Sequence, residues 1–77
     1  MSVNIENIKQ IVALQLGKQE IRDEDRFLED LHAESFDVMN IVIAIEDRYG
    51  VSIKEVEIPN LQTPLALYQF VKDRMEA

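Results

Sequence analysis

The spacing of apolar residues between positions 35 and 49 is the feature that most restricts how this chain folds. An α-helix turns about 100° per residue, so residues three and four apart lie on the same side. Five apolar residues follow this spacing: Val38, Ile41, Val42, Ile45 and Tyr49. A stripe of this kind is typical of a helix that packs one side against a hydrophobic core. We therefore predict a core-facing helix from Ser35 to about Tyr49, ended by Gly50.

Three other apolar residues of this helix, the outer apolar set, lie toward the side away from the stripe. They are Phe36, Met39 and Ile43, and polar or acidic residues surround them. One interpretation is that another helix covers these side chains. The other is that they form an exposed surface on which a partner protein docks, beside the start of the helix.

Ser35 stands where an acidic loop meets this helix, and a serine at a helix start is ordinarily a cap. His32, three residues earlier, raises the alternative of a hydrolase in which the histidine activates the serine. The chain lacks the glycine elbow that exposes such a nucleophile, and a helical chain of 77 residues gives little shelter from water. We therefore expect His32 to be an exposed loop residue.

Two further helices are predicted on either side of this segment. Apolar spacing favours a helix over 3–16, which Gly17 ends. Thr63 followed by Pro64 is a strong helix start, because Thr is a good cap and Pro fits the first helical position. We expect this last helix to run to about Arg74.

Residues 51–62 are less regular than the predicted helices. They alternate roughly between apolar and polar, as a strand does, but a single strand has no partner in this chain. We expect a loop with a short helix near 54–60, limited by Pro59. The predicted fold is an all-α bundle of three main helices plus one short helix, in a single domain over 1–77.

The connection over 18–34 is long for a compact domain, and such connections are often functional. Asp23 and Asp25 begin a spacing like that of a calcium loop, but Leu28 stands where the turn glycine is required. We therefore expect no specific metal site. Four apolar residues are expected to hold the connection to the core: Ile21, Phe27, Leu28 and Leu31.

Charge limits the partners that this chain can bind. The net charge is -7, and residues 20–47 hold ten acids against two arginines. Nucleic acids and anionic membranes are disfavoured, because binding them relies on basic patches. Basic protein surfaces are favoured, although an acidic surface can also serve solubility alone. The absence of cysteine, of a signal peptide and of a long apolar run is compatible with the cytoplasm.

Two adjoining segments resemble the acyl carrier protein family. The first is Asp30-Leu31-His32-Ala33-Glu34-Ser35-Phe36-Asp37, which is similar to the family form D-L-G-x-D-S-L-[DE] around the phosphopantetheine serine. The second is the apolar helix that ends in Glu46-Asp47-Arg48-Tyr49. Length, helix spacing and the late Thr-Pro helix start also fit, so the resemblance covers almost the whole chain.

The resemblance implies that a phosphopantetheinyl transferase attaches 4′-phosphopantetheine from coenzyme A to Ser35. The thiol of that arm would carry an acyl group as a thioester, so the protein is a carrier and not an enzyme. Its other partners would be acyl-transferring or synthase enzymes with basic docking patches. We expect a cytoplasmic monomer in fatty-acid or specialised lipid or secondary-metabolite synthesis.

The resemblance also assigns expected roles around the serine. The predicted docking residues are Glu34, Phe36, Asp37, Met39, Asn40, Ile43, Glu46 and Asp47. In the family the bundle interior can shelter the acyl chain, and the candidate lining residues are Met39, Val42, Ile43, Leu61 and Leu67. The alternative for each lining residue is ordinary core packing.

Five positions differ from the usual fatty-acid carrier. His32 stands in place of glycine, and Glu34 in place of Asp. Phe36 replaces Leu, Asn40 replaces Glu, and Arg48 interrupts an acidic run. These departures favour a specialised acyl carrier, with a D-alanyl or peptidyl carrier as the second choice. An alternative of another class is an acidic helical adaptor that is never modified.

Overall fold

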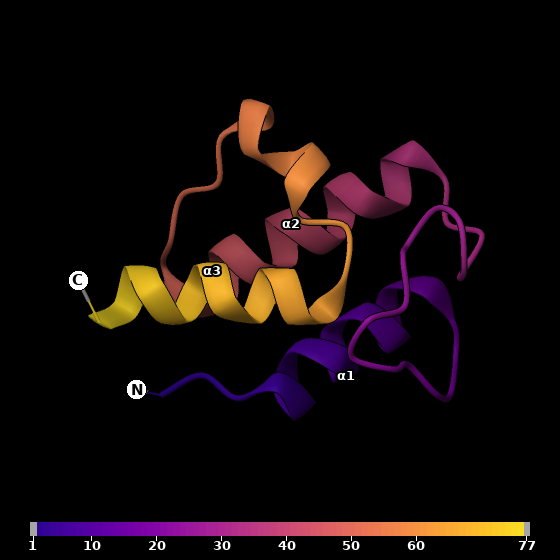
Figure 1. Cartoon of the computed structure of the whole chain (residues 1–77), viewed down its shortest axis with the longest axis horizontal. Coiled ribbons are helices and arrows are strands. Elements are labelled where there is room, and N and C mark those ends of the chain that lie inside the picture. Colours follow the sequence, from indigo (N-terminus) through magenta and orange to yellow (C-terminus); the bar gives the residue numbers. More distant parts are fainter. Residues whose placement is uncertain (1, 77) are drawn as a thin grey trace.

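The computed structural model describes residues 2–76, and no strand occurs among them. These residues form three main helices and one short 3₁₀ helix, in the order α1, α2, η1, α3. Figure 1 shows how α1, α2 and α3 lie together. Their bounds are Ile5–Leu16, Ser35–Tyr49, Glu55–Asn60 and Pro64–Glu76. The predicted bundle of three main helices plus a short one is confirmed, while Met1 and Ala77 of the predicted domain lie outside the described residues.

Helix ends follow the capping chemistry of the sequence. Thr63 Oγ1 accepts the Ala66 N–H at 3.1 Å, which confirms the predicted start of α3 at Pro64. Gly17 and Gly50 end α1 and α2 in the left-handed conformation, at φ 65° and 66°, where a side chain would be strained.

Two helix limits differ from the prediction. α1 begins at Ile5 and not at residue 3, because the Asn4 side chain accepts the Asn7 N–H at 2.8 Å and is therefore the cap. α3 continues to Glu76, two residues beyond Arg74. No helix-stopping glycine or proline follows Arg74 in the sequence, so the chain gives no signal to end there.

The hydrophobic core lies where the three main helices meet, and α1 packs against both α2 and α3. All five residues of the α2 stripe are buried, as predicted. Ile8 and Val12 contribute from α1, and Leu67 and Val71 from α3, each with no exposed surface. Burying this apolar surface stabilises the bundle and fixes the side of α2 that faces outward.

The connection between α1 and α2 is anchored in the core by Phe27, which is fully buried. The Phe27 N–H also donates to the Gln62 carbonyl oxygen at 2.9 Å, which ties the connection to the segment before α3. Leu31 is buried and Ile21 is partly buried, as expected. Leu28 is 46% exposed, so its predicted anchoring role is wrong: within one tight turn, Phe27 points inward and its neighbour outward.

The short helix η1 is attached to α3 by Arg74. The Arg74 Nη2 lies 3.1 Å from Glu57 Oε1, and the guanidinium stacks 4.4 Å from the centre of the Phe70 ring. The predicted short helix near 54–60 is present as Glu55–Asn60, with Pro59 in its last turn. Within residues 2–76, none of the helices is long and apolar enough to cross a membrane.

Candidate functional site

Ser35 is the first residue of α2 and is exposed. The preceding residue, Glu34, is the N-cap, with extended backbone at φ -95° and ψ 166°. Ser35 is therefore not the cap that a serine at a helix start ordinarily is. The Glu34 N–H donates to Asp37 Oδ2 at 3.0 Å, so an acid of the first turn secures the helix start.

Because Glu34 and Asp37 form the cap, the Ser35 hydroxyl is not needed to start the helix. Among residues 2–76, no side-chain hydrogen bond engages it. The first-turn N–H groups of a helix have no partner inside the helix, and they carry the positive end of its dipole. Such an end accommodates a phosphate. An exposed serine at this position therefore fits a group that is joined through a phosphodiester.

The outer apolar set lies on the exposed side of α2, next to Ser35. Phe36 is 61% exposed, Ile43 48% and Met39 37%. No helix among residues 2–76 covers these side chains, so the interpretation that another helix buries them is wrong. A cluster of three large apolar side chains in water beside the serine has the character of a docking surface.

The predicted acidic docking residues divide into two kinds. Glu34 and Asp47 are exposed, as is the neutral Asn40. Asp37 and Glu46 are half-buried and already accept backbone hydrogen bonds, Asp37 from Glu34 and Glu46 from Ile53 at 2.8 Å. These two carboxylates therefore stabilise the ends of α2, and Glu34 and Asp47 are the more exposed of the four acids.

The predicted acyl-lining residues do not share one environment. Val42, Leu61 and Leu67 belong to the buried core cluster. Met39 and Ile43 have exposed faces on the outer side of α2. A pocket for an acyl chain between these two groups stays a prediction.

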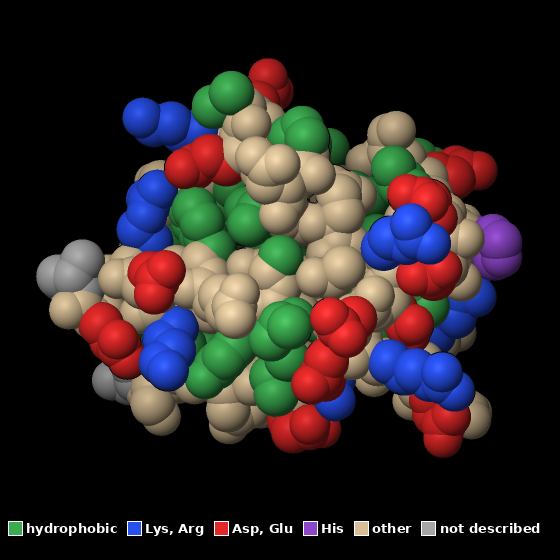
Figure 2. Space-filling view, in the orientation of Figure 1, with side chains coloured by type: hydrophobic (Ala, Val, Ile, Leu, Met, Phe, Trp, Pro, Cys, Tyr) green, Lys and Arg blue, Asp and Glu red, His purple; other side chains and the backbone are tan. Residues whose placement is uncertain are grey.

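His32 adopts a left-handed backbone conformation, with φ 56°, and is the one non-glycine residue among 2–76 to do so. It is exposed, as predicted, and lies on the loop before α2. No hydrogen bond joins it to Ser35 in the described part of the chain, so the geometry gives no support to a hydrolytic pair. In Figure 2 its imidazole, in purple, projects from the rim of the molecule near acidic and basic side chains.

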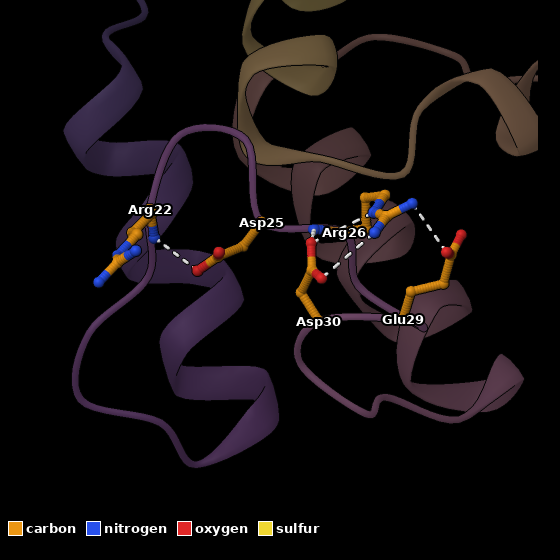
Figure 3. Close-up of polar contacts among 5 residues, drawn as sticks. All are labelled: Arg22, Asp25, Arg26, Glu29 and Asp30. Carbon is orange, nitrogen blue, oxygen red and sulfur yellow. Dashed lines mark hydrogen bonds and ion pairs between the residues drawn. The ribbon is translucent and has the colours of Figure 1, made fainter.

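A polar turn precedes the serine loop (Figure 3). The Asp30 carboxylate Oδ2 accepts the Arg26 backbone N–H at 2.8 Å and the Arg26 Nε at 3.3 Å. These bonds, the backbone one first, hold the pKa of Asp30 below its usual value. The Arg26 Nη1 also lies 2.8 Å from Glu29 Oε2. Sequence reasoning missed this turn, although an arginine four residues before an aspartate was a visible signal.

The acids of the calcium-like spacing have other partners. Asp23 Oδ1 pairs with the Lys9 Nζ at 2.8 Å, and Asp25 Oδ2 accepts the Arg22 N–H at 2.9 Å. The bonds that the Lys9 ammonium donates to Asp23 and Glu6 raise the pKa of Lys9, the bond to Asp23 most strongly. Within residues 2–76, no group of three potential ligands is placed to hold a metal ion.

Comparison with known proteins places these features in one family. Residues 6–71 match the family described as the phosphopantetheine attachment site. An acyl carrier protein of Buchnera aphidicola subsp. Baizongia pistaciae is 36% identical over 72 residues, which cover 90% of this chain and 92% of the relative. An acyl carrier protein of Helicobacter hepaticus is 37% identical over 60 residues, which cover 75% of this chain and 79% of the relative.

Proposed function

Because this chain belongs to the acyl carrier protein family, we propose that Ser35 is the residue to which its 4′-phosphopantetheine is attached. Proteins of this family are carriers and not enzymes. The single observation that supports the assignment is the place of Ser35: exposed, at the first position of α2, and not used as the cap. The prosthetic group, when bound, supplies a thiol that holds an acyl group as a thioester.

The attachment reaction requires an accessible serine oxygen. The Ser35 Oγ attacks the β-phosphorus of coenzyme A and forms a phosphodiester. The bond from that phosphorus to the departing adenosine 3′,5′-diphosphate breaks, and the serine proton passes to a base on the transferase. This chain contributes the nucleophilic oxygen, the open N–H groups of the first turn, and a surface for the transferase.

The docking surface is the outer side of α2, with the outer apolar set at its centre and Glu34 and Asp47 as exposed charges. A carrier must leave each enzyme after every step, so weak and charge-steered docking suits it. The partners are a phosphopantetheinyl transferase and acyl-transferring or synthase enzymes with basic patches. The chain acts as a monomer.

The cargo is a specialised acyl group. Phe36, Asn40 and Arg48 alter the docking side of α2 relative to the usual fatty-acid carrier. A D-alanyl or peptidyl cargo is the second choice, and the names of the two relatives favour an acyl cargo over it.

Intact mass spectrometry tests the attachment. The protein is incubated with coenzyme A and a broad-specificity transferase, beside Ser35→Ala and a control, Ser52→Ala, at another exposed serine. Wild type and Ser52→Ala should gain one phosphopantetheine, and Ser35→Ala none. A gain in Ser35→Ala would refute the assignment. No gain in any chain, with a known carrier modified in parallel, would favour the unmodified adaptor.

A further inference from the structure

The turn from Arg26 to Leu31 is closed by two sets of bonds. The Arg26 carbonyl oxygen accepts the N–H groups of Asp30 at 2.8 Å and Leu31 at 3.0 Å. In return, the Asp30 carboxylate accepts the Arg26 backbone N–H at 2.8 Å and the guanidinium Nε at 3.3 Å. Residues 26 and 30 therefore clamp each other through both main chain and side chain (Figure 3). We call this pair the Arg26–Asp30 clamp.

The clamp lies between a fixed point of the core and the serine. Phe27, next to Arg26, is fully buried. The Ala33 N–H donates to the Phe27 carbonyl oxygen at 2.8 Å, which closes the loop two residues before Ser35. Leu31, directly after Asp30, is buried as well, so the clamped turn joins two anchors in the core and sets the direction in which the chain enters the loop before Ser35.

The clamp is suited to local orientation more than to overall stability. Arg26, Glu29 and Asp30 are all exposed, and exposed ion pairs contribute little to the free energy of folding. The core residues of α2, in contrast, are buried in an apolar cluster that includes none of these three residues. Opening the clamp should leave the bundle folded while it loosens the loop that leads to Ser35.

We propose that Arg26 and Asp30 are positioning residues for the modification of Ser35, because their clamp holds the serine loop in the conformation that the transferase engages. This inference rests on the proposed attachment at Ser35. The two residues touch neither the serine nor the reacting phosphorus. They act by reducing the number of conformations open to the loop, so less conformational entropy is lost when the transferase binds.

Opposite charge changes separate this role from simple electrostatic docking. Asp30→Asn removes a negative charge, Asp30→Ala removes the acceptor as well, and Arg26→Gln removes a positive charge. Steering by a basic transferase would make the Asp30 variants slower and Arg26→Gln faster. Positioning makes all three slower. Glu24→Gln, at an exposed acid in the same connection but outside the clamp, is the matched charge control.

The experiment measures kcat/KM of the transferase on each purified chain and amide hydrogen exchange by NMR. We expect a loss of about tenfold in Asp30→Ala and about threefold in Arg26→Gln. Glu24→Gln should stay near wild type. The hydrogen-bonded amides of Ala33 and Glu34 should exchange faster in Asp30→Ala, while those of Ile41 and Ile45 keep wild-type exchange.

Two results would overturn the inference. One is an Asp30→Ala rate equal to that of Glu24→Gln. The other is a faster rate in Arg26→Gln, which would assign the effect to charge alone. Failure of the attachment itself would look different, since wild type would then gain no phosphopantetheine at Ser35 in the mass spectrum.

Discussion

The helix α2 and the connection that leads into it are held in place by different forces. One side of α2 is buried in a continuous apolar core, from Val38 to Tyr49. The connection is attached at few apolar points, mainly Phe27, and is otherwise shaped by exposed hydrogen bonds and ion pairs. Burial therefore decides where the helix lies, and polar contacts decide how its first residue is presented.

The largest expected effect comes from two isoleucines of α2 that differ only in the side they face. Ile41 is fully buried and Ile43 is 48% exposed. Ile41→Ala should lower the free energy of unfolding by about 2–5 kcal/mol through lost burial and a cavity. Ile43→Ala should change it by less than about 0.5 kcal/mol. Urea unfolding followed by circular dichroism measures both, and equal losses would contradict the assigned sides.

A charge on the exposed side should damage docking without damaging the fold. Ile43→Glu should lower kcat/KM of the transferase by about tenfold, because it places a charge within an apolar contact. Leu14→Glu, at a residue of α1 that is 85% exposed, is the control and should keep the wild-type rate. Both variants should unfold at wild-type urea concentrations. Equal rates in both would show that the outer apolar set does not contact the transferase.

His32 offers a smaller effect on the connection. The left-handed backbone of His32 costs about 1–2 kcal/mol for a residue with a Cβ. Glycine removes that cost, but it loses more conformational entropy on folding, which offsets part of the gain. His32→Gly should therefore raise the free energy of unfolding by about 0.5–1 kcal/mol. Gly50→Ala, at φ 66°, should lower it by a similar amount. Urea unfolding tests the pair, and a loss of stability in His32→Gly would contradict the account.

The smallest effect is the response of the Arg26–Asp30 clamp to acid. The pKa of Asp30 is lower in the folded chain, mainly because the Arg26 N–H donates to its carboxylate. The contribution of the clamp to the free energy of unfolding is therefore fully present above the pKa of Asp30 in the unfolded chain, about 3.9. It is lost as the pH falls through the lower pKa of Asp30 in the folded chain. The NMR shift of the Arg26 amide should follow this transition. Asp30→Asn should abolish it, and persistence of the transition there would assign it to another group.

Sequence periodicity predicted the scaffold well because burial follows helical spacing. The α2 stripe, the left-handed ends at Gly17 and Gly50, and the Thr63 cap are all confirmed. The short helix and the family resemblance are confirmed too. Each of these signals is local, or repeats with a fixed period, so it can be found without knowing the fold.

The details of the site were harder to predict because neighbouring residues compete for one role. Ser35 is a good cap by type, yet Glu34 takes that position and Asp37 accepts its N–H. Leu28 is as apolar as Phe27, yet only one of two adjacent side chains in a tight turn can face the core. The clamp depends on the path of the turn, which residue types alone do not define.

Site-resolved mass spectrometry on the wild-type chain tests the central claim most directly. After incubation with coenzyme A and the transferase, the protein is digested and the peptide that bears phosphopantetheine is fragmented. We predict the group on Ser35, with the peptides that contain Ser2 and Ser52 unmodified. Attachment at either of those serines, or modification spread over several residues, would contradict the view that the open first turn of α2 is the carrier site.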